Sequence, residues 1–449
     1  MKRGKSASES IAGALRNCVA HLGCIVQAGA NGKLSVVENG VLWIDPSGRV
    51  AALCGERKQI MLATRVVDWG ENIIIPGLVD AHLHLPQAPF SGVGGGELLP
   101  WLQQQAFPTE ARFADPALAK RVAERFFTGL AAVGTTSAAV FMTVHEAATR
   151  IAFTAAAKSG LRVWMGNALM NRQCPRALQL DIPGAVEASL ALIREWHGKG
   201  RMQYLVTPRF ALSCTPQLLR AAGRLAAEHG LRIQTHLSEN SSEIAAVADA
   251  FPECNSYAAV YAQNGCLEGA LLAHCVHLQN EELQLLSDAH ATVVHCPSSN
   301  RFLGSGVLGY ERILKAGIRL ALGTDVGAGY GLSMLKEMRE AMESSKTWNL
   351  LHPDRSQIEM SLGRALFMAT ASGAQALGAG AYLGKLEPGY QADFVVLDDT
   401  CINPWSDCQL FQQPVQRLQR IIYHGEAALV RATFVAGEAV YRRAGALDA

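Results

Sequence analysis

The sequence predicts an α/β protein, a TIM-type (β/α)8 barrel with a small β-sandwich domain formed from both ends of the chain. Through the middle of the chain, eight apolar runs typical of β-strands alternate with helical patterns. The two ends instead carry short strand and turn patterns. The 449 residues, 49% of them hydrophobic, are enough for a large barrel plus a smaller unit.

The eight runs span residues 78 to 326. They are LVDAHLH, TTSAAVF, RVWMGNALM, MQYLVTPRF, RIQTHLSE, ALLAHCVHL, ATVVHCPSS and IRLALGTDV. Between them, Asp115 and Pro116 predict the start of a helix that runs to Gly134, and Thr215 with Pro216 predicts another that ends at Gly230. Eight strands, each followed by a helix, make a barrel.

The ends of the chain contain the β-patterns LSVVENGVLWID and VAAL on one side, and DFVVLD and ATFVAGEAVY on the other. Since strands from both ends can share one sheet, we expect residues 1–70 and 381–449 to form the β-sandwich and residues 71–380 to form the barrel.

Composition narrows the function classes. Forty basic and 39 acidic residues give a net charge of +1, so no electrostatic footprint for nucleic acid is present. No apolar run approaches the length of a membrane span, so no membrane partner is expected. The 11 cysteines are scattered, with no CxxC pair, which favours a reducing cytoplasmic location. A small neutral ligand is the partner that fits best.

Polar residues gather at the ends of the predicted strands, where TIM barrels place their chemistry. These residues are His82, His84, Arg209, His236, Glu239, His274, His295 and Asp325. Six of the eight runs finish in such a group, which random scatter of 13 histidines would not produce.

A metal site is the first interpretation of these residues. Alternation along a strand turns His82 and His84 to one face, and His236 and Asp325 can complete the set. Three histidines and one aspartate suit one Zn²⁺ or Fe²⁺ per chain with an open position for water. Taken singly, each histidine could be a hydrogen-bonded core residue, and Asp325 could cap the following helix.

Two further groups have candidate catalytic roles. Glu239 lies three residues after His236, where it could move protons without binding the metal, or could simply open a helix capped by Ser238. His274 could bind the metal or orient the water, and we favour the second role.

Candidate substrate contacts are Gln87, Arg209, Phe210 and Trp101. The Arg209 guanidinium suits adjacent acceptors such as O6 and N7 of guanine, and Phe210 or Trp101 could lie against a planar ring. A structural ion pair for Arg209 and plain packing for the aromatic residues are the alternatives.

These motifs, in this order, resemble the amidohydrolase superfamily and within it the guanine deaminase family. The resemblance covers roughly residues 70 to 400 and is carried by PGLVDAHLHLPQ, LLPWLQQQAFPTEARF, TPRFALSC, THLSEN, LAHC, HCPSSNRFLGSG and GTDVGAGYGLSMLKEMR. It implies hydrolysis of guanine to xanthine and ammonia, and a homodimer.

The resemblance also implies residue roles. His82, His84, His236 and Asp325 would hold the metal, and Glu239 would shuttle protons. Gln87, Arg209 and Phe210 would contact the base.

Two other hypotheses stay open. The same chemistry could act on a triazine, a pterin or an oxidised purine. A non-catalytic scaffold could also keep the barrel, although such a scaffold would be expected to lack ligands, and none is missing here.

Overall fold

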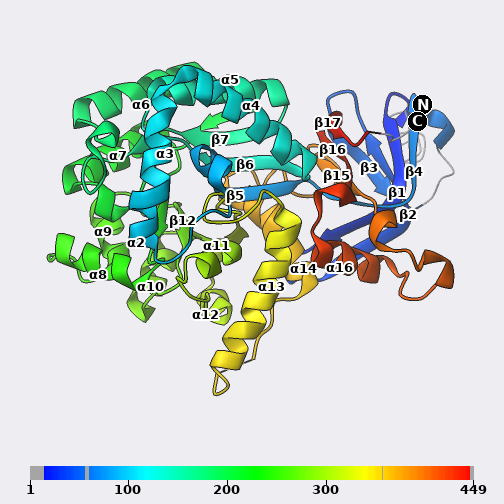
Figure 1. The fold of residues 1–449 in the computed structure, drawn as a ribbon. Helices are drawn as coiled ribbons and strands as arrows, with labels where there is room; N and C mark the ends of the chain where they lie inside the picture. Colours follow the sequence, from blue (N-terminus) through cyan, green and yellow to red (C-terminus); the bar gives the residue numbers. More distant parts are fainter. Residues whose placement is uncertain (1–14, 56–59, 356, 445–449) are drawn as a thin grey trace, which may run out of the picture.

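The computed structural model describes residues 15–55, 60–355 and 357–444, which form a barrel beside a smaller β-sheet (Figure 1). The outermost parts of the predicted end segments, residues 1–14 and 445–449, lie outside the described residues. Across the described ranges, no helix combines the length and apolar character needed to cross a membrane.

Strands from both ends of the chain form one seven-stranded sheet in the order β17-β16-β15-β4-β1-β2-β3 (Figure 1). They are β1 (Val19–Ala28), β2 (Leu34–Ile44), β3 (Val50–Cys54), β4 (Arg65–Pro76), β15 (Phe394–Leu397), β16 (Val430–Val435) and β17 (Glu438–Arg442). Strand β4 joins the two halves, because it runs parallel to β1 and antiparallel to β15. It continues through Gly77 into the first barrel strand, so the sheet is tied directly to the barrel.

The eight predicted runs are the eight strands of the barrel, which confirms the predicted fold class. They are β5 (Leu78–His84), β6 (Thr135–Phe141), β7 (Arg162–Gly166) with β8 (Ala168–Leu169), β9 (Met202–Tyr204) with β10 (Thr207–Pro208), β11 (Gln234–Leu237), β12 (Leu271–His274), β13 (Thr292–His295) and β14 (Arg319–Leu322). All pairings among them are parallel. Their carboxyl ends therefore meet at one mouth.

Asp80 links the first and last strands of the barrel. Its carboxylate accepts hydrogen bonds from the Thr324 hydroxyl at 2.6 Å and from the backbone amides of Thr324 and His82 at 3.0 and 3.3 Å. The Asp325 amide also donates to the His82 carbonyl at 2.8 Å. Gly323, the residue before Thr324, packs closely against β5, because a Cβ atom there would come within 2.8 Å of His82. The end of β14 is thus held against the strand that carries the paired histidines.

Helices cover the outside of the barrel. They are α2 (Leu98–Trp101), α3 (Phe107–Ala111), α4 (Pro116–Ala132), α5 (Glu146–Ser159), α6 (Ile182–Trp196), α7 (Pro216–His229), α8 (Ser241–Ala250), α9 (Tyr257–Gln263), α10 (Asn280–Asp288), α11 (Pro297–Phe302), α12 (Tyr310–Lys315), α13 (Met334–Leu351), α14 (Leu362–Phe367), α15 (Gly373–Ala376) and α16 (Pro414–His424). Of these, α14 and α16 also contact strands of the seven-stranded sheet. Asp115 and Thr215 cap α4 and α7 through their side chains, and Gly230 ends α7 in the left-handed conformation.

A segment between the first strand and α4 adds a wall to the barrel mouth. A π-helical turn over Leu102–Ala106 connects α2 to α3. Leu98, Trp101 and Leu102 from this segment line the cavity at the mouth. The cavity-lining residues of this segment thus come from α2 and from the first residue of the π-helical turn.

Candidate metal centre

The paired histidines at the end of β5 meet on one carboxylate oxygen. The Nε2 atoms of His82 and His84 lie 3.2 and 3.3 Å from Oδ1 of Asp325, which follows β14. All three residues are buried. The period of two in β5 and the hydrogen bonds that close the barrel therefore bring these groups together.

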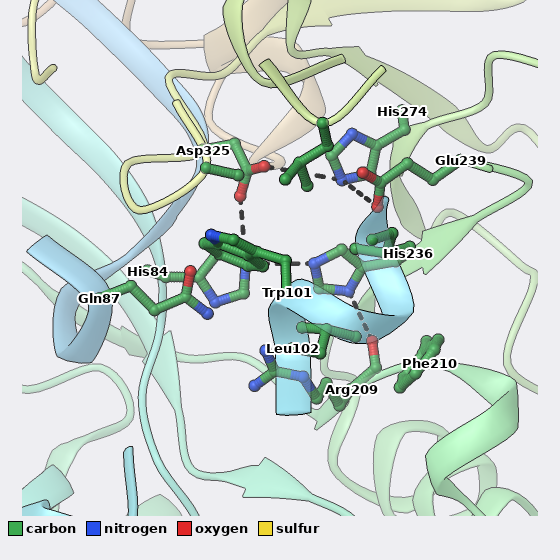
Figure 2. A pocket seen from close by; sticks show the side chains of 13 residues that line it. His84, Gln87, Trp101, Leu102, Arg209, Phe210, His236, Glu239, His274 and Asp325 are labelled. Carbon is green, nitrogen blue, oxygen red and sulfur yellow. Dashed lines mark hydrogen bonds and ion pairs between the residues drawn. The ribbon is translucent and has the colours of Figure 1, made fainter. Parts of the chain in front are cut away.

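Two more histidines face the same point from β11 and β12 (Figure 2). His236 Nε2 is 3.1 Å from His84 Nε2, and His274 Nε2 is 3.9 Å from Asp325 Oδ2. Ligand atoms of His82, His236, His274 and Asp325 all lie within 4.8 Å of one another. The structure thus gathers every predicted metal ligand, and it places His274 in the same cluster.

The protons on these rings lie on the outer nitrogens. His236 Nδ1 is 2.6 Å from the Arg209 carbonyl oxygen, and His274 Nδ1 is 2.8 Å from Asn300 Oδ1. Because both oxygens only accept, each Nδ1 carries the hydrogen and each Nε2 turns a lone pair inward. Burial lowers the pKa of His236 well below its ordinary value and that of His84 to about 4, so the neutral, metal-binding form is favoured.

These converging lone pairs fit a divalent cation. His82 Nε2 and His274 Nε2 are buried and, within the described chain, have no hydrogen-bond partner apart from the carboxylate oxygens 3.2 and 3.3 Å away. Orphaned buried polar atoms are costly, and the nitrogens here surround a carboxylate. The donor set of imidazole nitrogens and one carboxylate suits a transition metal such as zinc or iron.

Backbone strain marks the same strand ends. Ser238, His274 and Asp325 adopt positive φ values of 49°, 71° and 46°, a region that non-glycine residues seldom occupy. Each residue lies at or just after the end of a barrel strand. Such conformations persist where the surroundings enforce them, and they concentrate at functional sites.

Glu239 lies beside the cluster and is buried at 2% exposure. Its Oε2 is 3.3 Å from His274 Nε2, and it accepts a hydrogen bond from the Ser305 hydroxyl at 3.2 Å. Burial, together with the nearby charge of Asp325, raises the pKa of Glu239 to about 8. A carboxyl group with such a pKa can take up and release a proton near neutral pH.

The cavity above the cluster offers both apolar and polar contacts. Its empty space, counted out to the open mouth, is about 360 Å³. The other residues that line it are Gln87, Leu98, Trp101, Leu102, Arg209, Phe210, Leu303 and Ala328 (Figure 2). All four predicted substrate contacts therefore face the same cavity as the histidines.

The structure adds one residue that sequence reasoning missed. Glu110 of α3 pairs with Arg209, and both of its carboxylate oxygens lie 2.7 Å from Arg209 Nη1. Arg209 is thus ion-paired and also lines the cavity. Glu110 lies inside the FPTE motif, but a lone glutamate on a short helix gave no signal that it would reach the end of the fourth barrel strand.

The fold and this site define a hydrolase barrel whose mouth carries residues that could hold a metal ion. The chain belongs to the amidohydrolase family, whose model matches residues 73–440.

Within this family, the chain is similar to several guanine deaminases. The guanine deaminase of Escherichia coli (strain K12) is 34% identical over 91% of this chain and 93% of its own length. That of Mus musculus is 32% identical, with the same shares covered. A crystal structure of guanine deaminase from C. acetobutylicum with bound guanine in the active site matches with a TM-score of 0.90 and 31% identity, over 95% of this chain and 100% of that chain.

Proposed function

We propose that this amidohydrolase is a guanine deaminase, which converts guanine and water to xanthine and ammonia. The observation that carries the proposal is that three kinds of group line one cavity. They are the cluster of histidines with Asp325, the buried Glu239 of raised pKa, and the side chains of Gln87 and Arg209. The similarity to guanine deaminases over nine tenths of the chain supports the choice of substrate.

We propose one Zn²⁺ per chain, held by His82, His84, His236 and Asp325, with Fe²⁺ as the other candidate. His274 would orient the attacking water or join the ligands, because its Nε2 faces both Asp325 and Glu239. When bound, the ion would supply the Lewis acidity that makes hydroxide available at neutral pH.

Proton transfer falls to Glu239. Its carboxylate, 3.3 Å from His274, receives the proton that water loses as oxygen attacks C2 of guanine, with Asp325 as a second acceptor. Protonated Glu239 then donates to ring N3. The proton of the new C2 hydroxyl passes through Asp325 or Glu239 to the amino group, the C2–N bond breaks, and ammonia leaves with xanthine as the other product. Burial raises the pKa of Glu239, which favours the protonated form that the second step needs.

The remaining cavity residues orient the ring. Gln87 and Arg209 would hydrogen-bond to the edge of the base, while Phe210 and Trp101 would pack against its plane. Holding C2 over the cluster turns the reaction into an effectively unimolecular step, which is a large part of the rate gain that enzymes achieve.

The test is a guanine-to-xanthine assay on protein of measured metal content, run beside a panel of triazines, pterins and oxidised purines with ammonia as the readout. We expect guanine to turn over fastest. Turnover of guanine no faster than that of the poorest panel member would overturn the substrate. A metal-free, stably folded and inactive preparation would favour the scaffold hypothesis.

Two expectations about the protein's setting complete the proposal. The resemblance to the family favours a homodimer, which light scattering would test.

The scattered cysteines favour a cytoplasmic location, which fractionation of the native cells would test.

A further inference from the structure

Glu110 lies behind the polar wall of the cavity, which we define as Gln87 and Arg209. It is 1% exposed and is not among the residues that line the cavity. Arg209 Nη1 donates to both of its oxygens at 2.7 Å, and Gln87 Nε2 donates to Oε1 at 2.8 Å. One carboxylate therefore holds both members of the polar wall.

We propose that Glu110 is a positioning residue that sets the hydrogen-bonding polarity and the net charge of the polar wall, so that the cavity selects an uncharged base with an N–H donor beside an oxygen acceptor. This inference rests on the proposed function, because it concerns how guanine is selected at that same site.

The polarity follows from the chemistry of the carboxylate. An ionised carboxylate only accepts, so the Gln87 amide must turn its NH₂ group toward Glu110 and keep Oε1 as a free acceptor. Gly327 leaves room for this arrangement, because a Cβ atom there would lie 2.2 Å from Gln87 Oε1. Within the described residues, no other hydrogen bond engages the Gln87 side chain.

Arg209 supplies the opposite polarity. Its Nη1 is engaged by Glu110, which leaves Nε and Nη2 as donors. The polar wall thus presents an acceptor beside donors. The N1–H and O6 atoms of guanine, which are adjacent on the ring, complement this pattern, whereas two neighbouring acceptors or two neighbouring donors do not.

The charge follows from burial. Arg209 is 3% exposed, and Glu110 is its one ion-pair partner in the described part of the chain. A buried cation without a partner is unfavourable, and it would attract any anion that fits the space. With Glu110 present the pair is neutral, so a neutral ring gains hydrogen bonds while an anionic ring gains no net attraction.

The experiment compares Glu110→Gln with wild type as metal-loaded enzyme, with guanine as substrate and urate, an anion at neutral pH, as competitive inhibitor. We expect the KM for guanine to rise by about tenfold or more while kcat changes less than about threefold, because binding geometry is lost and the proton shuttle is kept. We expect urate to bind about tenfold more tightly, because Arg209 is left without its counter-charge.

The matched control is Asp393→Asn, which breaks another buried arginine pair. Asp393 binds Arg162 at 2.7 and 3.1 Å, at the start of β7 and thus at the end of the barrel opposite the cavity. It should lower stability and leave both the KM for guanine and the urate inhibition unchanged.

Glu110→Asp keeps the charge and shortens the reach. It should raise the KM for guanine without tightening urate inhibition, and it carries the test if Glu110→Gln fails to fold. Unchanged KM and unchanged urate inhibition in a folded, metal-loaded Glu110 variant would overturn the inference. Failure of the wild type to deaminate guanine would instead overturn the proposed function, so the two failures are distinguishable.

Discussion

Glu239 combines properties that no other carboxyl group of the cavity shares. It is buried, contacts His274 across 3.3 Å and has a pKa raised to about 8, whereas Asp325 is engaged by two histidines. These properties support the proposed role of Glu239 as the proton shuttle.

Replacing Glu239 with Gln should lower turnover of guanine by about two orders of magnitude or more, because the amide cannot carry the proton. Metal content, measured by mass spectrometry, should stay near one ion per chain. Glu282→Gln is the control, since this buried carboxylate accepts from the amides of Ala258 and Gln279 and takes no part in the cavity. Near-wild-type turnover of the Glu239 variant would refute the shuttle role.

Removing the metal should both abolish activity and lower the thermal stability. Without the ion, the buried Nε2 atoms of His82 and His274 lose the cation that they would bind. A ligand present at about 1,000 times its Kd contributes about 4 kcal/mol to the free energy of unfolding. Chelation followed by thermal unfolding, then re-addition of Zn²⁺, measures the effect. A chelated sample with unchanged activity and melting temperature would contradict the metal assignment.

The part of the site that the sequence could predict is the part that lies on the barrel strands and at their ends. Strand positions followed from apolar runs and helix caps, and the period of two in residues 78–84 was enough to pair His82 with His84. The contact of His84 with His236 spans 152 residues, and no local pattern encodes it; barrel closure provides it. Glu110 was missed because its role depends on α3 lying beside the end of the fourth strand.

At the closure of β14 on β5, Asp80→Ala should destabilise the fold by about 1 to 3 kcal/mol, because the Thr324 amide and hydroxyl lose their buried acceptor. Metal affinity should fall with it, since His82 is two residues away on the same strand. Urea unfolding and metal titration give the two readouts. Thr324→Val removes one of these hydrogen bonds and should show a smaller loss. An Asp80 variant with wild-type stability would show that the strands close without this link.

The two ends of the molecule meet in the seven-stranded sheet, for which the sequence predicted strands but not their order. The strand patterns placed β-structure at both ends, but the order β15-β4-β1 rests on long-range pairing that no spacing reveals. In this sheet His21 is buried between Trp69, Phe394 and Phe434. Its Nδ1 accepts a hydrogen bond from Trp69 Nε1 at 3.1 Å, which requires the neutral ring.

This histidine makes stability sensitive to acid. Burial, with Arg442 and Arg65 nearby, lowers the pKa of His21 to about 3 from an ordinary value of 6.5. The unfolded chain therefore binds the proton first, so stability is complete above pH 6.5 and falls as the pH drops toward 3. Between pH 7.5 and 5 the loss from this group should be about 2 kcal/mol.

The measurement is urea unfolding at several pH values with His21→Gln as the comparison, because glutamine can accept from Trp69 but does not titrate. The difference between wild type and variant should shrink or reverse as the pH falls. Parallel pH profiles for the two proteins would show that His21 does not titrate on unfolding.

Strand β4 also has a consequence for how the protein is made. Its partner β15 begins with Phe394, paired to Pro76 across 318 residues of chain. At 5 to 20 residues per second, a ribosome needs roughly 15 to 65 s to supply that partner. During this interval the edge of β4 in the nascent sheet is open to pairing with other chains. Slow synthesis or high expression should therefore lower the yield of this protein more than that of a barrel whose sheet is not built from both ends of the chain.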